Sequence, residues 1–192
     1  MALTKVNTGG LAADSVDNTI LKLDDDYALT GAVTGATPIT HLDQWRLTTA
    51  FGGTAQPIAS NLERVDTGGQ GTIGSAMTVS SGIFTFPVTG IWLVKFLANL
   101  SRAGDSRYQT IYIEATTNNS SYASIGQSNS NVNQSESGRT YVTNYVESTV
   151  DVTNVTNVKV RFSITPSQSD VLCHGDSTLN NTTFTFIRLG DT

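Results

Sequence analysis

The sequence predicts an all-β protein, an antiparallel β-sandwich of the jelly-roll type. Short runs of alternating apolar and polar residues follow one another from residue 41 to the C-terminus, separated by turns rich in Gly, Asn and Ser. From residue 41 onward no segment has the apolar spacing of a helix, so the strand-and-helix alternation of a parallel sheet is missing. At 192 residues the chain can bury one good-sized core. We therefore expect an extended arm over residues 1–40 and one head domain over residues 41–192.

The expected strands begin directly after the arm. The first covers residues 42–49, with Leu42, Trp45 and Leu47 as candidate core positions, and a second at residues 58–65 follows a loop that contains two glycines. The later strands are separated by polar turns. They are expected at residues 83–88, 91–100, 108–116, 122–127, 140–150, 158–165 and 183–189.

The strand at residues 91–100 is apolar on nearly both faces. Side chains alternate across a strand, so its residues divide into two sets. One set is Trp92, Val94, Phe96, Ala98 and Leu100, and the other is Ile91, Leu93 and Leu97, with Lys95 as the only charge. A two-sheet sandwich covers only one face of each strand. We therefore expect either a sheet packed on both sides or a second partner that covers this face, and a neighbouring subunit is the simplest such partner.

Two segments are almost free of apolar residues and are predicted to be loops at the ends of the sandwich. They are residues 118–121 and residues 127–138. Such loops are exposed to solvent or contact a ligand. Solvated loops are the simpler interpretation, because nothing in either segment converges as a binding site would.

Composition excludes several classes of partner. Only 14% of the residues are charged, the net charge is −5, and Lys and Arg are scattered, so no basic surface is available for nucleic acid. No apolar run is long enough to insert in a membrane. The N-terminus has no signal-peptide pattern, which predicts synthesis in a cytoplasm.

No residue pattern predicts catalysis, a cofactor or a metal site. Cys173 and His174 are adjacent, so a strand would send them to opposite faces and prevent a thiolate–imidazole pair. His41 has no potential zinc ligand near it. The run at residues 24–26 lacks the Asp-X-Asp spacing of a calcium loop. Asp170 and Asp176 flank His174 and would hold a cation only if folding added further oxygen ligands.

The sequence Gly-Ile-Phe-Thr-Phe-Pro-Val-Thr-Gly-Ile-Trp at residues 82–92 resembles the central signature of the trimeric jelly rolls of the complement and tumour-necrosis-factor type. Residues 183–189, Thr-Phe-Thr-Phe-Ile-Arg-Leu, look like the last strand of that family. The resemblance implies a homotrimer whose inner sheet lies near the threefold axis. We expect four aromatic residues to pack in that inner sheet, without a prediction of which strand faces meet the partner. They are Trp92, Phe96, Phe184 and Phe186.

The N-terminal segment has a resemblance of its own. Residues 3–6, 10–16 and 27–35 look like the N-terminal segments of fibre and appendage proteins of tailed bacteriophages. This resemblance implies a protein of the virion, made in the host cytoplasm and attached to other virion proteins through residues 1–40. The sequence does not separate a tail fibre or head fibre that contacts a host glycan or protein from a capsid decoration protein.

A carbohydrate-binding, lectin-like module is the alternative, because a sandwich with polar loops also permits it. This alternative requires exposed aromatic side chains in a groove. The candidates are Tyr108, Tyr122, Tyr141 and Tyr145, and cross-strand packing is the simpler role for all four.

Overall fold

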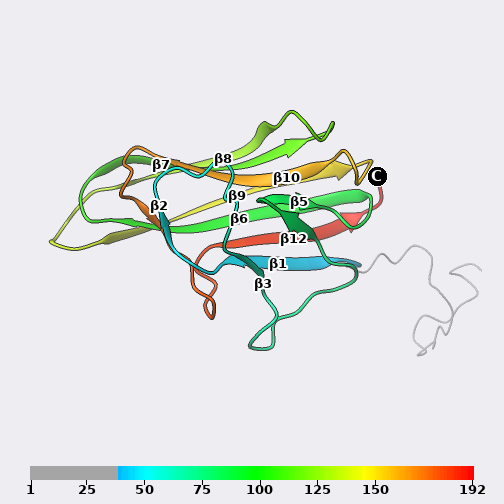
Figure 1. Cartoon of the computed structure of the whole chain (residues 1–192), viewed down its shortest axis with the longest axis horizontal. Coiled ribbons are helices and arrows are strands. Elements are labelled where there is room, and N and C mark those ends of the chain that lie inside the picture. Colours follow the sequence, from blue (N-terminus) through cyan, green and yellow to red (C-terminus); the bar gives the residue numbers. More distant parts are fainter. Residues whose placement is uncertain (1–38) are drawn as a thin grey trace, which may run out of the picture. The chain divides into compact units, whose positions relative to one another are not determined.

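A computed structural model describes residues 39–192, and the predictions made for residues 1–38 lie outside this part of the chain. Within it the chain forms strands in two sheets (Figure 1). The seven-stranded sheet contains β1 (Leu42–Leu47), β2 (Phe51–Gly52), β3 (Leu62–Arg64), β6 (Gly90–Arg102), β9 (Thr140–Val152), β11 (Leu172–Cys173) and β12 (Thr183–Gly190). The five-stranded sheet contains β4 (Thr78–Ser80), β5 (Ile83–Thr85), β7 (Ser106–Thr116), β8 (Ala123–Val132) and β10 (Lys159–Pro166).

All strand pairs in both sheets are antiparallel, which confirms the predicted jelly-roll sandwich. The five-stranded sheet has the order β4-β5-β10-β7-β8. In the other sheet β6 is central, because β9 pairs along one of its sides while β12 and β11 share the other. The chain changes sheet six times, at the connections β3–β4, β5–β6, β6–β7, β8–β9, β9–β10 and β10–β11. No helix of the described residues is long and apolar enough to cross a membrane.

An aromatic cluster fills the space between the two sheets. Phe162 of β10 faces Phe184 of β12 with a distance of 4.6 Å between ring centroids, and Phe96 of β6 stacks on Phe184 at 5.1 Å. Phe84 of β5 joins them from the five-stranded sheet. Aromatic pairs at such distances stabilise a core beyond the effect of burial alone. The core therefore connects β5 and β10 of one sheet with β6 and β12 of the other.

The predicted core position Leu42 is wrong. Leu42 lies on the outward side of β1, and the inward side carries Asp43, Trp45 and Leu47. Period-two alternation requires this result, because positions 42 and 45 of a regular strand point to opposite faces.

Burial of Asp43 is compensated because its carboxylate accepts hydrogen bonds from the Trp45 indole at 3.0 Å and the Met77 amide at 2.9 Å.

The loop predicted at residues 127–138 is wrong in its first half, because β8 continues to Val132. Its backbone pairs with β7, which is enough to form a strand without apolar side chains. On the side toward β9, a Cβ atom added to Gly126 would lie 2.6 Å from Ser148 Oγ and 2.9 Å from Val146 Cγ2, so even a methyl group there would require these side chains to move. The short strands β3 and β11 likewise depend on pairing with longer neighbours, β1 and β6, while β2 pairs with β11 and β4 pairs with β5.

Candidate functional site

The outward face of the seven-stranded sheet is the first candidate surface. Along β6, Trp92, Val94 and Phe96 are at most 1% exposed, and the residues between them are half-buried. The chain has no third layer over this face in the part that the structure describes. Ile91, Leu93 and Leu97 of β6 therefore point away from the core toward the outside of the sandwich.

Neighbouring strands extend this apolar surface. Leu93 pairs with Ile187 of β12, which in turn pairs with Leu42 of β1, and Leu42 forms a bridge with Ile73. On the other side of β6, Leu97 pairs with Tyr145 of β9, which is 46% exposed. We call this surface the apolar face. It consists of Leu42, Ile73, Ile91, Leu93, Leu97, Tyr145 and Ile187.

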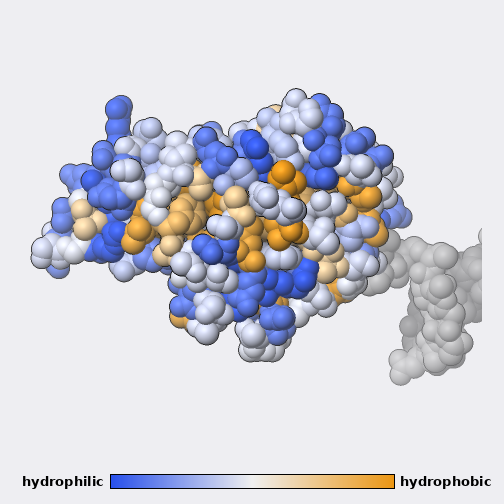
Figure 2. All heavy atoms as spheres, in the orientation of Figure 1, coloured by the Kyte–Doolittle hydropathy of each residue, from blue (hydrophilic) through white to orange (hydrophobic). Residues whose placement is uncertain are grey.

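Several polar side chains on this side of the sheet are paired with one another. Lys95 Nζ lies 3.7 Å from the carboxylate of Glu147 on β9, and Gln44 donates a hydrogen bond to Thr185 at 2.8 Å. Arg46 pairs with Glu63 at 3.1 Å at the β3 side. A charge that is already paired can be covered by another protein surface at a lower desolvation cost than an unpaired one. In the view of Figure 2, hydrophobic residues gather along the middle of the domain and hydrophilic residues toward its margins.

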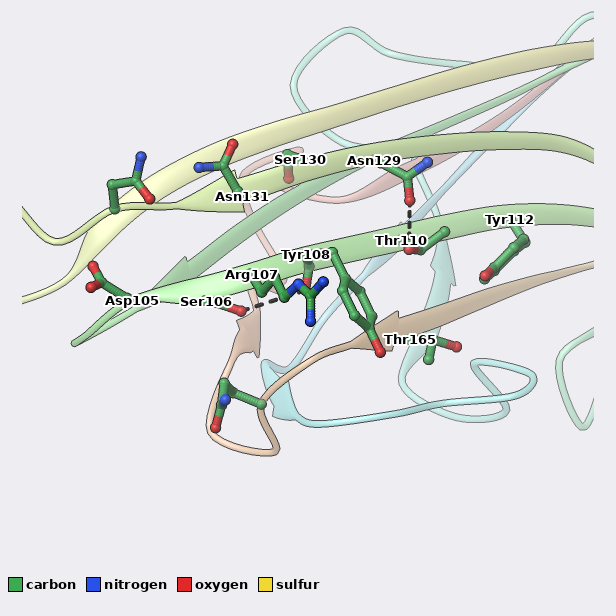
Figure 3. Close-up of a pocket in the computed structure, with 12 residues that line it drawn as sticks. Asp105, Ser106, Arg107, Tyr108, Thr110, Tyr112, Asn129, Ser130, Asn131 and Thr165 are labelled. Atoms are coloured by element: carbon green, nitrogen blue, oxygen red, sulfur yellow. Dashed lines mark hydrogen bonds between the residues drawn. The ribbon is translucent and has the colours of Figure 1, made fainter.

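The five-stranded sheet carries a second candidate surface, an open polar depression of about 990 Å³ (Figure 3). Its walls come from the start of β7, the end of β8 and the segment after β10. The lining includes an exposed tyrosine and an exposed arginine among amide and hydroxyl side chains. The principal lining residues are Arg107, Tyr108, Thr110, Asn129, Asn131 and Thr165.

Comparisons with known proteins identify the fold. No protein-family model matches the chain, and no curated protein matches it. Solved structures do match, among them Eiger TNF from S. frugiperda, with a TM-score of 0.57 and 10% identity over 79% of this chain and 93% of that one. Murine APRIL at pH 5.0 matches with a TM-score of 0.54 and 10% identity over 78% of this chain and 98% of that one. The chain has the jelly-roll fold of these structures.

The four predicted packing residues all lie in the core of this jelly roll. Trp92, Phe96, Phe184 and Phe186 are each at most 1% exposed and point between the two sheets. They therefore cannot contact another subunit directly. The outward residues of the same strands form the apolar face. The alternation along β6 divides its side chains into two sets, but it does not predict which set faces the core.

The predicted tyrosine candidates lie on different surfaces of the jelly roll. Tyr108 borders the depression, whereas Tyr122 stacks under the Arg161 guanidinium at 4.2 Å. Tyr141 and Tyr145 lie on β9, on the outward side of the seven-stranded sheet. The four residues do not form one aromatic groove, and only Tyr108 lies in a depression.

One hydrogen-bonded pair that sequence reasoning missed joins Ser101 of β6 to His174. Ser101 Oγ lies 2.7 Å from His174 Nε2, but Ser101 is fully buried and no carboxylate is hydrogen-bonded to the imidazole in the described part of the chain. Burial, and then the positive charge of Arg139, lower the pKa of His174. The pair lacks the accessible nucleophile and the oriented base of a catalytic dyad. Its separation of 73 residues hides it from sequence analysis.

The Cys173 side chain does not interact with the imidazole of His174. Its sulfur packs in the core 3.5 Å from Thr182 Oγ1, and burial raises the pKa of the thiol to about 12. A thiol with so high a pKa is not a nucleophile at neutral pH.

The two aspartates near His174 serve local structure. Asp170 forms an ion pair with Arg102 at 2.6 Å, and the Arg102 side chain lowers the pKa of that carboxyl. Asp176 accepts hydrogen bonds from Thr178 and from the Leu179 amide. Residues 39–192 contain no group of three or more His, Cys, Asp or Glu side chains placed to hold a metal ion. The acidic run at residues 24–26 lies outside the described residues.

Proposed function

We propose that this chain is a non-enzymatic structural protein of a bacteriophage particle. It is a homotrimer whose jelly-roll heads pack through the apolar face and whose residues 1–40 attach it to other virion proteins. In this role it is a tail fibre, a head fibre or a capsid decoration protein, and it is made in the host cytoplasm. The apolar face is the observation that carries the proposal.

The size and composition of the apolar face support self-association. It continues across four paired strands, β9, β6, β12 and β1, with no layer of the described chain above it. Contiguous exposed apolar surface of this kind is typical of interaction sites in soluble proteins. Burying it stabilises an assembly by roughly 25 cal/mol per Å² of apolar surface, and obligate interfaces bury thousands of Å². A second and third copy of the chain supply the matching surface.

The attachment to a phage particle rests on the sequence. The N-terminal segment resembles phage fibre and appendage proteins, and a polar, weakly charged head without a disulfide framework suits a particle assembled in a cytoplasm. An arm of 40 residues that joins a compact head is long enough to reach across the surface of a neighbouring protein.

Sedimentation of the purified protein tests the trimer. We expect the wild type to sediment as a trimer and Leu97→Glu to sediment as a monomer, because the new carboxylate would be buried at the interface. Leu179→Glu is the matched control, since Leu179 is 63% exposed in the β11–β12 connection and is not part of the apolar face. A wild type that stays folded as a monomer at micromolar concentration contradicts the proposal.

Deletion of residues 1–40 tests the attachment. We expect the truncated protein to remain trimeric in sedimentation but to be absent from particles purified after complementation of a phage that lacks the gene. Normal incorporation of the truncated protein would show that the attachment lies in the head domain.

A carbohydrate-binding module is the second candidate function. The observation that favours it is the exposed Tyr108 in a depression lined by amide and hydroxyl groups, the combination that binds sugar rings and their hydroxyls. The two functions are compatible, because the depression and the apolar face belong to different sheets. A glycan array tests it, and the absence of binding to any glycan would exclude it.

A further inference from the structure

We propose that the depression on the five-stranded sheet binds an acidic saccharide, with Tyr108 as the stacking platform for a sugar ring and Arg107 as the partner of its carboxylate. This inference rests on the second proposed function, carbohydrate binding, and adds to it the site, the ligand class and the two residues that select the ligand.

A β-bulge places these two residues together. Between the pairs Ser106–Val132 and Gln109–Ser130, β7 contains Arg107 and Tyr108 where β8 contains only Asn131. The extra residue interrupts the usual alternation, so two consecutive side chains are both exposed. Bulges of this kind often redirect side chains next to functional sites. In Figure 3 the Arg107 guanidinium and the Tyr108 ring lie beside each other on the same side of β7.

Ser167 holds the bulge in place. Its hydroxyl oxygen accepts hydrogen bonds from the amides of Arg107 at 3.0 Å and Tyr108 at 3.3 Å, and its own amide donates to the Tyr108 carbonyl at 2.9 Å. The Ser106 hydroxyl lies 3.0 Å from the same Ser167 oxygen. The backbone beneath the two exposed side chains is therefore fixed before any ligand binds, which lowers the entropic cost of binding.

The side chains of Arg107 and Tyr108 have no partner among the described residues. No carboxylate of residues 39–192 lies within 4.0 Å of the Arg107 guanidinium, although five of the other arginines of the head form ion pairs. Tyr108 is 42% exposed and takes part in no aromatic or cation–π contact of the described chain. A ring face and a guanidinium fork are thus both available, and the fork matches the two oxygens of a carboxylate.

The remaining polar groups suit sugar hydroxyls. Asn129 Oδ1 accepts a hydrogen bond from Thr110 at 2.6 Å, which orients its amide nitrogen as a donor. Asp105 is the only carboxylate in the lining, and its Oδ1 accepts from the Gln134 amide at 2.7 Å. Figure 3 shows Asp105 at the end of the depression, pointing away from Arg107. The positive charge of Arg107 is therefore not neutralised locally, and an acidic sugar is favoured over a neutral one.

Binding to matched glycans tests the proposal with the full-length protein. The probes are immobilised uronic acid oligosaccharides and the same oligosaccharides after reduction of their carboxyl groups. We expect the wild type to prefer the acidic form by about tenfold, the effect of one charge-assisted pair. Arg107→Gln should lose this preference and keep its binding to the neutral form. Tyr108→Ala should lose binding to both forms.

Lys159→Gln is the control for charge, because Lys159 lies on the same sheet at the other end of β10. We expect it to keep the tenfold preference, and thermal unfolding should show that all variants are folded. Binding to both forms without preference would overturn the acidic-sugar inference and leave carbohydrate binding intact. Binding that survives Tyr108→Ala would place the site elsewhere, and no binding to any glycan would overturn both proposals.

Discussion

Asp43 shows how one side chain connects the strands to the loop that follows β3. Besides the Trp45 indole and the Met77 amide, its carboxylate accepts from Arg64 Nε at 3.1 Å. Arg64 also donates to the Met77 carbonyl at 2.5 Å. Of its three partners only Trp45 is close in sequence, and Arg64 and Met77 are 21 and 34 residues away, so sequence analysis had no signal for this buried acid. The buried carboxylate of Asp43 holds the loop between β3 and β4 in place through these hydrogen bonds.

Replacement of Asp43 should test this role. We expect Asp43→Ala to lower the free energy of unfolding by about 2–4 kcal/mol, because two donors and an arginine lose their acceptor. Asp43→Asn keeps one acceptor oxygen and should cost clearly less. Urea denaturation measures both changes, and equal losses would contradict a role for the retained oxygen.

His174 should make stability depend on pH. Because burial and the charge of Arg139 lower its folded-state pKa below the ordinary value of 6.5, the unfolded chain binds more protons than the folded one between these two values. Stability should therefore be constant above about pH 6.5 and fall as the pH decreases from 6.5 through the folded-state pKa. Urea denaturation between about pH 5 and pH 7.5 measures this slope.

The variant His174→Gln should reduce that slope and not abolish it. Burial and the nearby Arg188 also lower the pKa of His41, which leaves a second group that titrates in the same direction. Glutamine retains a polar terminus that can reach Ser101, so the loss of stability at neutral pH should be small. An unchanged slope in the variant would show that His174 does not titrate as described.

At the level of elements, strands with apolar side chains were predictable, whereas polar strands and the shortest ones were not. The strand at residues 91–100 was recognisable from its own apolar residues, and β6 covers it with two extra residues at its C-terminal end. In contrast, β8 is almost entirely polar and exists because β7 supplies its hydrogen bonds. Period-two apolar patterns detect strands that bury side chains, and they miss strands that only pair their backbone.

The turn between β4 and β5 depends on Gly82. Its φ is +78°, and a Cβ atom there would lie 2.3 Å from the Ile58 carbonyl oxygen. We expect Gly82→Ala to destabilise the fold by about 3 kcal/mol, since the backbone of residues 58–59 must move. Gly68→Ala is the matched control, because Gly68 has a φ of +66° with no atom within 4 Å of the new Cβ. It should cost only about 1 kcal/mol.

Thermal or chemical unfolding compares the two glycine variants. Both variants carry the cost of a side chain at positive φ. The difference between their free energies of unfolding therefore measures the steric contact of the new methyl group at position 82 with residues 58–59. Equal destabilisation would mean that the contact at Gly82 relaxes without cost.

At the level of the whole molecule, folding and assembly should be coupled. If the apolar face is buried between subunits, unfolding releases separate chains and the unfolding midpoint rises with protein concentration. We expect a higher midpoint for the wild type after a hundredfold increase, about 10⁻⁷ to 10⁻⁵ M. Leu97→Glu should have a lower midpoint that does not change with concentration. A wild-type midpoint that is independent of concentration would contradict an obligate trimer.

The sequence by itself determined the fold class and the division of β6 into two sets of side chains, because alternation follows from local backbone geometry. The tertiary structure decided which set is buried. Trp92 and Phe96 meet the other sheet, while Leu93 and Leu97 remain outside. It also brought Ser101 to His174 and placed Arg107 beside Tyr108 through a bulge. These features depend on pairing and register between segments far apart in the chain, and no local pattern encodes them.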